Sequence, residues 1–329
     1  MAGRTAGIFV CSIAYLLLLF SNAAAETLTA RDKLGREMKI QIPVKRTVFF
    51  QTYELIPALG IWNRAVGIAR FAYDNDLMKA VKPDFAQTIP SAGGGTDINM
   101  EALMKLKPDL VVTWTVRPEN ITYMEQKGLK VYSIYPESLE ELYEVIRFHG
   151  KIFSKEKRAQ VVMNEMDKVF NLVRMHVSDI PPERKQKVLW VGSRPTSVAC
   201  AIGVTHDIIA LAGGMNPAAE YQQRNADVSI EKIIAWNPDV IFIWGNAKYS
   251  AEDIMNNPQW RFVKAVKNRR VYKAPEWSTW SPRLAPVVLW MASKTYPVLF
   301  QDVNITKETD AFFRKVFGIP FSKVKGFAG

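Results

Sequence analysis

The sequence feature that most constrains the fold is an internal repeat. Residues 98–114 read INMEALMKLKPDLVVTW, and residues 228–244 read VSIEKIIAWNPDVIFIW. The two segments lie 130 residues apart and share a Glu, a Pro-Asp pair and a final Trp at matching positions. Chance similarity between two helix–strand units is the alternative, but the shared residues at one offset favour duplication of a lobe. We therefore expect two similar lobes.

Each repeated segment predicts a short helix, a turn and a buried strand. Asn99 and Ser229 are favoured N-caps, and the Glu two residues later lies in the first turn, where the helix dipole favours a carboxylate. The Pro of the Pro-Asp pair cannot continue the helix. The apolar runs 110–112 and 240–243 are typical of strands that are covered on both faces of a sheet.

Further strands are predicted on either side of these units, at residues 47–50, 130–134, 187–191 and 270–273. Helical patterns lie between the strands, which favours parallel sheets. The chain is therefore expected to be an α/β protein with two Rossmann-like lobes.

A long helical region is predicted between the lobes. One amphipathic pattern covers residues 139–153, where Gly150 and Ser154 could interrupt it, and a second covers residues 155–178. The second stretch would extend roughly 36 Å if it is unbroken. We expect one long interlobe α-helix that acts as a stiff connection. The predicted division is an N-terminal lobe, an interlobe helical region and a C-terminal lobe, at residues 26–137, 138–180 and 181–329.

Residues 1–25 predict a cleavable signal peptide. Arg4 precedes the apolar run 7–20, and three Ala residues follow before an expected cleavage site at Glu26. An uncleaved anchor is the alternative, but about 14 apolar residues are short against the roughly 20 that span a bilayer. Cleavage also removes Cys11 and leaves Cys200 alone, which cannot form an internal disulfide.

The charge of the chain is basic, at +11, and loss of Arg4 with the signal peptide would leave +10. The Lys and Arg residues are scattered and form no dense run, so we expect no nucleic-acid partner. The basic charge could attract an anionic ligand or a membrane surface, or it could have no function at all.

No sequence pattern of a common enzyme is present. The chain lacks a Gly-x-Ser-x-Gly elbow, a Walker A loop and a His-Glu-x-x-His segment. Gly93-Gly94-Gly95 does not have the spacing of a dinucleotide fingerprint and more simply predicts a turn or a close backbone approach. We expect neither catalytic residues nor a resident cofactor.

A protein-held metal site is also not expected. His149, His176 and His206 are dispersed along the chain, and a structural role is favoured for each. His206 stands near a helix start and remains a candidate ligand contact.

A ligand would be expected beyond the carboxyl ends of the strands, as in other open α/β sheets. Loops there contain aromatic residues, which stack on planar ligands, and Arg residues, which bind carboxylates bidentately. The loop 276–283 is the most suggestive, although one Trp could instead pack in the core and its Arg could pair with an acid. The candidate ligand-binding residues are Tyr53, Arg70, Tyr73, Trp114, Arg194, Trp244, Trp277, Trp280 and Arg283.

Together these features resemble the periplasmic substrate-binding proteins of ABC importers for iron-siderophore, haem and cobalamin. The resemblance is carried by the repeated units 101–109 and 231–239, the interlobe helix, Leu211-Ala212-Gly213-Gly214, and residues 277–283. It implies two α/β lobes joined by one long helix and a location in the periplasm. The few His residues differ from family members that bind bare zinc or manganese.

The resemblance also implies a function that is not enzymatic. A monomeric protein would capture a metal chelate between its lobes, with an iron or cobalt chelate as cargo, and deliver it to a permease dimer and its ATPase. Glu101 and Glu231 would dock onto that permease. The alternatives are a ligand-sensing receptor and, less expected, a secreted chelate-modifying enzyme. The choice among siderophore, haem and corrinoid stays open.

Overall fold

The computed structural model describes residues 26–327, so the predicted signal peptide lies outside the described residues. The strands are β1 (Glu26–Arg31), β2 (Glu37–Ile42), β3 (Thr47–Phe49), β4 (Ala65–Ile68), β5 (Leu110–Trp114), β6 (Val131–Ile134), β7 (Val188–Val191), β8 (Ser197–Ala199), β9 (Asn225–Asp227), β10 (Val240–Ile243) and β11 (Val271–Lys273). The α-helices are α1 (Leu55–Leu59), α2 (Asp76–Val81), α3 (Phe85–Thr88), α4 (Met100–Lys105), α5 (Pro118–Gln126), α6 (Leu139–Ile152), α7 (Glu156–Val177), α8 (Val204–Leu211), α9 (Ile230–Trp236), α10 (Ala251–Met255), α11 (Lys264–Lys267), α12 (Leu284–Thr295) and α13 (Ile305–Phe317).

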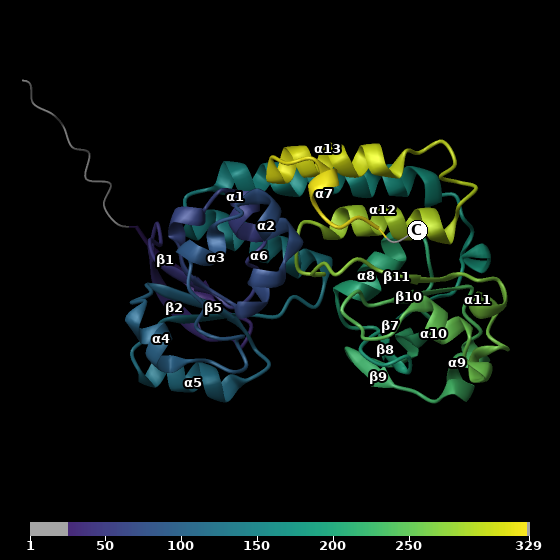
Figure 1. Cartoon of the computed structure of the whole chain (residues 1–329), viewed down its shortest axis with the longest axis horizontal. Coiled ribbons are helices and arrows are strands. Elements are labelled where there is room, and N and C mark those ends of the chain that lie inside the picture. Colours follow the sequence, from purple (N-terminus) through teal and green to yellow (C-terminus); the bar gives the residue numbers. More distant parts are fainter. Residues whose placement is uncertain (1–25, 328–329) are drawn as a thin grey trace, which may run out of the picture.

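Two sheets form the centres of two lobes (Figure 1). Within residues 26–327, the N-terminal sheet has the order β4-β3-β5-β6 and is wholly parallel. The C-terminal sheet has the order β11-β10-β7-β8-β9, in which the first three strands are parallel and the last two antiparallel. The predicted α/β fold is confirmed, and each predicted strand is present to within two residues at either end. The sequence did not predict β4, β8, β9 or the antiparallel hairpin β1–β2.

The repeated segments form α4–β5 in one lobe and α9–β10 in the other. The side chains of Asn99 and Ser229 accept the backbone N–H groups of Ala102 and Lys232, and so cap the two helices as predicted. In both copies the Glu lies in the first helical turn.

The Pro-Asp pair has the same role in both lobes. The Asp109 carboxylate accepts the backbone N–H groups of Lys45 and Arg46, at 3.1 and 2.9 Å, just before β3. The Asp239 carboxylate accepts the N–H of Lys187 at 2.8 Å, just before β7. Each aspartate therefore ties the start of its own strand to the start of the neighbouring central strand.

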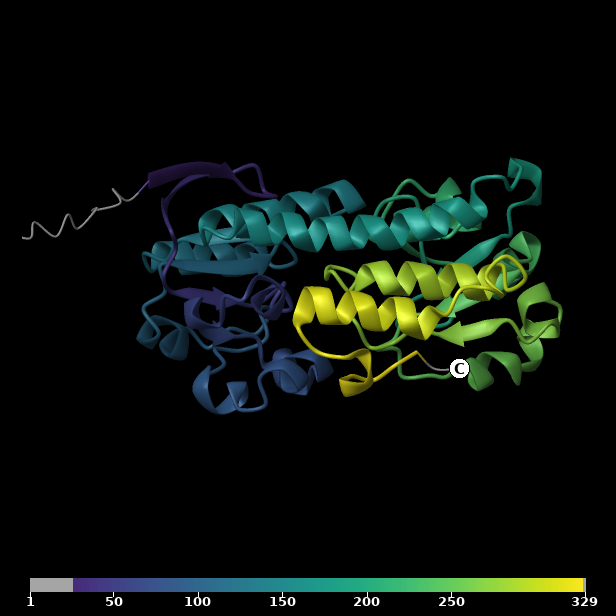
Figure 2. The ribbon, with the colours of Figure 1, turned by 90° about the horizontal axis from the view of Figure 1, so that it is seen from above.

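The connection between the lobes consists of α6 and α7, which pack against each other. The helix α6 begins beside α8, where the Leu139 N–H donates to the Asp207 carboxylate at 2.6 Å, and it ends beside β3. A turn follows, with Ser154 at a φ of 54°. Gly150 permits close contact between the helices, because a Cβ there would lie 2.7 Å from the Cβ of Ala159. The helix α7 then returns along both lobes (Figures 1 and 2).

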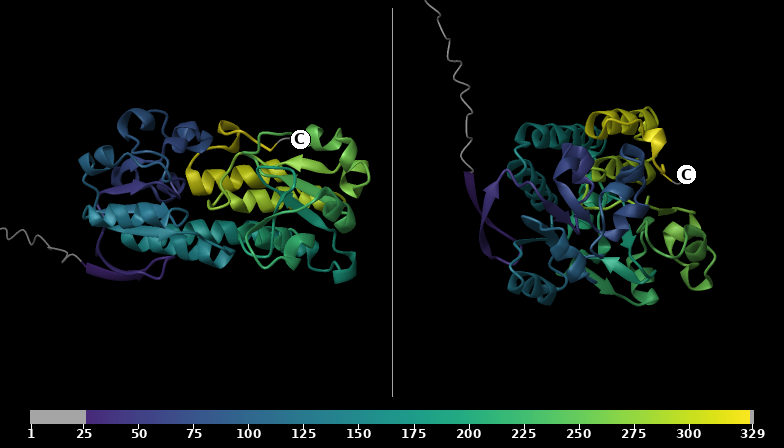
Figure 3. Two further views of the ribbon diagram at one scale, coloured as in Figure 1. Left: turned by 90° about the horizontal axis from the view of Figure 1, so that it is seen from below. Right: turned by 60° about the vertical axis from the view of Figure 1, so that its left-hand side comes forward.

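The C-terminal helices also belong to the connection. Both α12 and α13 pack along α7, as Figures 2 and 3 show, and α13 additionally contacts α1 of the N-terminal lobe. One apolar core runs from the N-terminal sheet through α6 and α7 to α12 and α13. The division at residue 181 therefore separates segments that share one core.

Within the described residues, no helix is both long and apolar enough to cross a membrane. Cys200 is buried and free.

Candidate ligand-binding site

Four of the candidate residues lie at the carboxyl ends of parallel strands. Trp114 is the last residue of β5, and Trp244 directly follows β10 at the matching position of the repeat. Arg70 and Arg194 follow β4 and β7 and are exposed. Trp244 leaves 37 % of its surface exposed, which is unusual for so large an apolar side chain.

Aromatic side chains from the two lobes meet where these strands end. The rings of Trp114 and Trp280 lie edge to face with centroids 6.5 Å apart, and Tyr135 lies 4.8 Å from Trp280 in the same manner. Trp280 comes from the loop after β11, whereas the other two come from the N-terminal lobe. We call Trp114, Tyr135 and Trp280 the interlobe aromatic cluster. The fold thus brings together two residues that were predicted separately from the two halves.

One arginine side chain lies directly over this cluster. The Arg224 guanidinium lies 4.2 Å above the Tyr135 ring and pairs with Glu137. Glu137 also pairs with Lys33 at 2.8 Å. Hydrogen bonds from Lys33, and further ones from Arg224, hold the pKa of Glu137 below its ordinary value although partial burial opposes them.

Arg70 and Arg194 each have one exposed acidic partner, Asp97 and Asp227 respectively. The site therefore offers flat apolar rings, with Arg224 over Tyr135. The loops after β4 and β7 add two exposed arginines, each paired with one exposed aspartate. Such a surface suits a ligand that is both planar and anionic.

The glycine run lies beside the cluster. Gly93 and Gly95 have φ values of 112° and 88°. A Cβ at Gly95 would lie 3.3 Å from the indole nitrogen of Trp114. The predicted close backbone approach is confirmed.

Arg283 and Trp277 are not part of this surface. Arg283 has no exposed surface, and its guanidinium pairs with Glu54 at 3.0 Å and with Asp76 at 2.7 Å. Its guanidinium carbon also lies 4.7 Å from the centre of the Trp277 ring, which is only 4 % exposed and packs against Phe313. The prediction that these two residues line an accessible site is corrected: burial withholds both from a ligand, and Arg283 instead joins α12 to the N-terminal lobe.

The two candidate tyrosines are partly buried. The Tyr73 hydroxyl donates to the Ile89 carbonyl at 2.9 Å, and its ring packs on Phe85. Tyr53 packs against the apolar core, and burial raises the pKa of its phenol.

The histidines have the structural surroundings expected for them. His149 is fully buried, and its Nδ1 lies 2.7 Å from the Val145 carbonyl oxygen. His206 lies 3.4 Å from Asn216. Residues 26–327 contain no group of three or more His, Cys, Asp or Glu side chains that could hold a metal ion.

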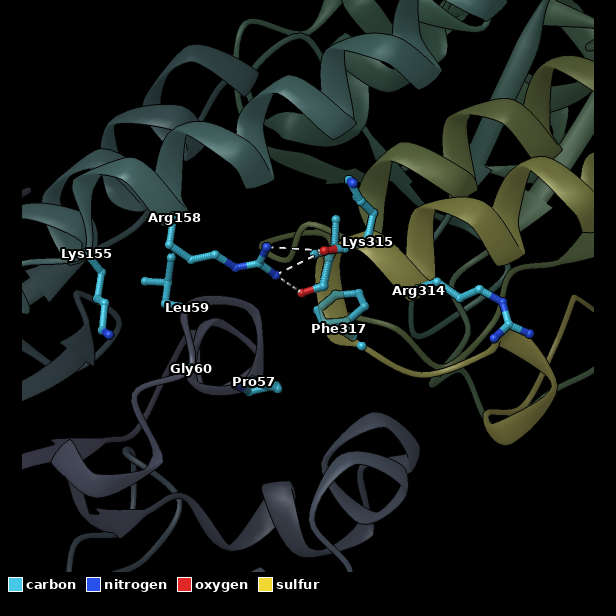
Figure 4. A pocket seen from close by; sticks show the side chains of 10 residues that line it. Pro57, Leu59, Gly60, Lys155, Arg158, Arg314, Lys315 and Phe317 are labelled. Atoms are coloured by element: carbon cyan, nitrogen blue, oxygen red, sulfur yellow. Dashed lines mark hydrogen bonds between the residues drawn. The ribbon is translucent and has the colours of Figure 1, made fainter.

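A hollow of about 510 Å³ lies elsewhere, between the ends of α1 and α13 and the first turn of α7 (Figure 4). Arg158 lies in it and donates to the backbone carbonyl oxygens of Ala58 at 2.7 Å and Lys315 at 3.2 Å. This side chain thereby joins α7 to α1 and to the last turn of α13. Because its donors are already used, we assign the hollow a structural role.

The two glutamates of the repeat lie away from the interlobe aromatic cluster. Glu101 and Glu231 are exposed on α4 and α9, and these helices lie on the side of the molecule opposite α7 in Figure 1. Glu101 pairs with Lys105 on the same helix at 2.6 Å. The pKa of Glu231 lies below its ordinary value because its own backbone N–H and the Ser229 side chain donate to it.

Residues 48–276 match the family described as periplasmic binding protein. The chain belongs to this family. The resemblance inferred from the repeat is thereby confirmed, and members of the family are binding proteins rather than enzymes.

Relatives of the chain share most of its length. The molybdate-binding protein MolA of Haemophilus influenzae is 22 % identical, and the alignment covers 93 % of this chain and 95 % of MolA. The Fe(3+)-citrate-binding protein YfmC of Bacillus subtilis is 25 % identical, over 72 % of this chain and 75 % of YfmC.

Among solved structures, CeuE of Helicobacter pylori, in a nickel–histidine complex, superposes with a TM-score of 0.80 and 27 % identity. The superposition covers 91 % of this chain and 98 % of CeuE. The chain therefore has the two-lobed fold of these periplasmic binding proteins, while its relatives bind different ligands.

Sequence reasoning missed several residues of the site. Tyr135 directly follows the predicted strand 130–134, so its position at a carboxyl end could have identified it. Asp97 and Asp227 extend the repeat by one residue upstream and could have been found by continuing the comparison. Nothing in the sequence distinguishes Arg224.

Proposed function

We propose that the chain is the periplasmic solute-binding protein of an ABC importer and that its cargo is an anionic metal chelate. Residues 1–25 would direct it to the periplasm and then be removed, and the mature protein would act as a monomer. The interlobe aromatic cluster, with Arg224 over Tyr135 and exposed arginines in the loops after β4 and β7, is the observation that carries the proposal.

The chemistry of this surface favours a chelate over a small oxyanion. A bare oxyanion needs hydrogen-bond donors in a small site and gains little from indole rings. A haem, a ferric siderophore or a corrinoid has a broad organic surface that can stack on Trp114 and Trp280. Negative groups on such a chelate would pair with Arg70, Arg194 or Arg224. Among these chelates, the arginines favour those with carboxylate or catecholate oxygens over the nearly neutral cobalamin.

Delivery of the cargo would use the exposed glutamates of the repeat. Glu101 and Glu231 occupy equivalent places in two similar lobes, and a permease dimer offers two equivalent surfaces. We propose that each glutamate docks on a basic socket of the permease. A ligand-sensing receptor would have the same cargo site without delivery, and cargo uptake in a strain that lacks this protein separates the two functions.

Binding of defined probes tests the cargo class. The mature protein is titrated with haemin, ferric citrate, cyanocobalamin and sodium molybdate, with tryptophan fluorescence as the readout. We expect haemin or ferric citrate to bind. Haemin, which can stack on the indole rings, should lose roughly 30-fold or more in affinity in Trp280→Ala and Trp114→Ala, as for a central contact.

Phe262→Ala is the matched control, because Phe262 is an exposed aromatic residue that lies beneath Arg261 in the C-terminal lobe. It should bind as the parent does. Tight binding of molybdate alone, with no loss in either Trp variant, would show that the proposed cargo class is wrong.

A further inference from the structure

The two lobes contain matching pairs of an exposed arginine and an exposed aspartate. Asp97 and Asp227 lie 130 residues apart, so they extend the repeat. Each stands two residues before the N-cap of a helix and four residues before the glutamate on that helix. Each forms an ion pair with an arginine from a loop at the carboxyl ends of the strands. We call Arg70–Asp97 and Arg194–Asp227 the Arg–Asp pairs.

In the N-terminal lobe, the backbone connects this pair to both the cargo surface and α4. The Arg70 N–H donates to the Gly93 carbonyl at 3.0 Å, and the Asn99 N–H donates to the Ala92 carbonyl at 2.9 Å. The segment between them passes Trp114 at Gly95. Asp97 therefore lies between the interlobe aromatic cluster and the helix that carries Glu101.

In the C-terminal lobe, the same connection is made by β8 and β9. Asp227 pairs with Ser197 in the ladder between these strands, and the Ser197 N–H donates to the Arg194 carbonyl at 3.0 Å. Arg224, which stacks on Tyr135, directly precedes β9. One short strand thus separates the interlobe contact from the N-cap of α9.

The Arg–Asp pairs are suited to exchange. All four side chains are more than half exposed. Exposed pairs of this kind contribute little to stability, so an anionic ligand can replace the aspartate at small cost. Arg283 differs in this respect, because it is buried with Glu54 and the Asp76 side chain is only 16 % exposed.

We propose that anionic cargo displaces Asp97 from Arg70 and Asp227 from Arg194. The release of the two aspartates would then signal to α4 and α9 that cargo is bound. The inference rests on the proposed function, because the exchange requires anionic cargo beside the interlobe aromatic cluster. Loaded and empty protein would then present different docking helices without a large movement of the lobes.

Two kinds of variant test whether cargo displaces the aspartates, because they should change cargo affinity in opposite directions. Asp97→Asn and Asp227→Asn free an arginine and should bind ferric citrate or haemin about two- to fivefold more tightly. Arg70→Gln and Arg194→Gln free an aspartate and should bind the same probe more weakly. Glu119→Gln is the control for charge, since Glu119 forms an exposed pair at 3.5 Å with Arg117, which lies three residues after the end of β5. If the pairs only held their loops in place, all four variants would weaken binding.

Hydrogen–deuterium exchange of peptides 97–106 and 227–237 tests whether release of the aspartates affects α4 and α9. In the parent, loading should speed exchange in both peptides by about two- to fivefold, because one exposed ion pair is lost from each. Empty Arg70→Gln and Arg194→Gln should already exchange at the loaded rate, each in its own lobe.

The outcomes separate this inference from the proposed function. If the parent binds a probe but neither loading nor the Arg variants change hydrogen–deuterium exchange in the two peptides, the proposed signal to α4 and α9 is wrong and the cargo assignment stands. If the parent binds neither probe, the cargo assignment is wrong, and exchange in the empty Arg variants still decides whether the aspartates act on the helices. Weaker cargo binding by Asp97→Asn and Asp227→Asn would show that cargo does not displace these aspartates.

Discussion

At the scale of single residues, Arg283 is a large charged side chain with no exposed surface. It comes from the start of α12 and reaches two carboxylates of the N-terminal lobe, Glu54 and Asp76. Both acids have further donors: Asn75 donates to Glu54 at 2.6 Å, and the Lys325 N–H donates to Asp76 at 3.0 Å. A buried charge with its hydrogen bonds satisfied is costly to disturb, because loss of one partner leaves the others unpaired.

Replacement of Arg283 should therefore affect stability strongly. We predict that Arg283→Met lowers the free energy of unfolding by about 3–5 kcal/mol, measured by urea denaturation. Arg117→Met removes an exposed arginine with one acidic partner and should cost about 0–1 kcal/mol. Similar losses in the two variants would contradict the assignment of Arg283 to the core.

His149 should make stability depend on pH. Burial, partly offset by the hydrogen bond to Val145, lowers the pKa of His149 from 6.5 to about 4 in the folded protein. Between these values the unfolded chain binds a proton that the folded protein does not, so stability is lost as pH falls from 6.5 to about 4. The loss from this group is about 3 kcal/mol.

His149→Leu should show a correspondingly smaller fall in the free energy of unfolding between pH 7 and pH 4.5 than the parent. The Thr52 hydroxyl keeps a partner in this variant, because it also donates to the Gln51 carbonyl at 2.8 Å. His176→Gln keeps His149 and should fall as steeply as the parent. Parallel curves for parent and His149→Leu would count against this origin of the pH dependence.

At the scale of elements, α4 and α9 are the parts that the repeat duplicates most closely. Both begin with a capped N-terminus and carry an exposed glutamate in the first turn. Because these side chains are exposed, their replacement should disturb the free protein little.

We predict that Glu101→Lys and Glu231→Lys leave cargo affinity and melting temperature nearly unchanged but impair uptake in cells. Like charges at a basic docking surface should weaken docking by roughly tenfold or more. Each single variant should be partly defective and the double variant far worse. Glu140→Lys, on α6, is an exposed charge reversal outside the repeat and serves as control. Normal uptake by the double variant would remove the docking assignment, and lost cargo affinity would place these residues in the binding site.

The sequence predicted elements well where local rules determine them. The N-caps, the Pro-Asp turns and the buried strands follow from residues close to one another in the chain. Partners far apart were not predictable in this way: Arg283 pairs with a carboxylate 229 residues earlier, and only the assembled fold places them together. The same holds for the contact between Trp114 and Trp280, whose positions at strand ends were predictable but whose meeting was not.

At the scale of the whole molecule, the lobes share one continuous core. The helices α6, α7, α12 and α13 form a layer across both lobes, and Arg158 and Arg283 join them further to the N-terminal lobe. Hinge closure needs a few residues that can absorb a large backbone change. A packed layer of helices provides few of these, so large closure is not expected.

Small-angle scattering tests this rigidity. We predict that the radius of gyration of the mature protein stays the same within error on addition of a bound chelate. Arg283→Met, if folded, should permit a larger change because one connection between the lobes is lost. A clear decrease in the radius of gyration of the parent would contradict a rigid connection.

The central claim is that an anionic chelate binds at the interlobe aromatic cluster. The most direct measurement is the visible absorbance spectrum, with metal analysis, of the protein purified from its native host. We predict a chromophore of a haem or a ferric chelate in the parent, and its loss in the Trp114→Ala/Trp280→Ala double variant. A colourless parent that contains a full equivalent of molybdate or another simple oxyanion would contradict the claim.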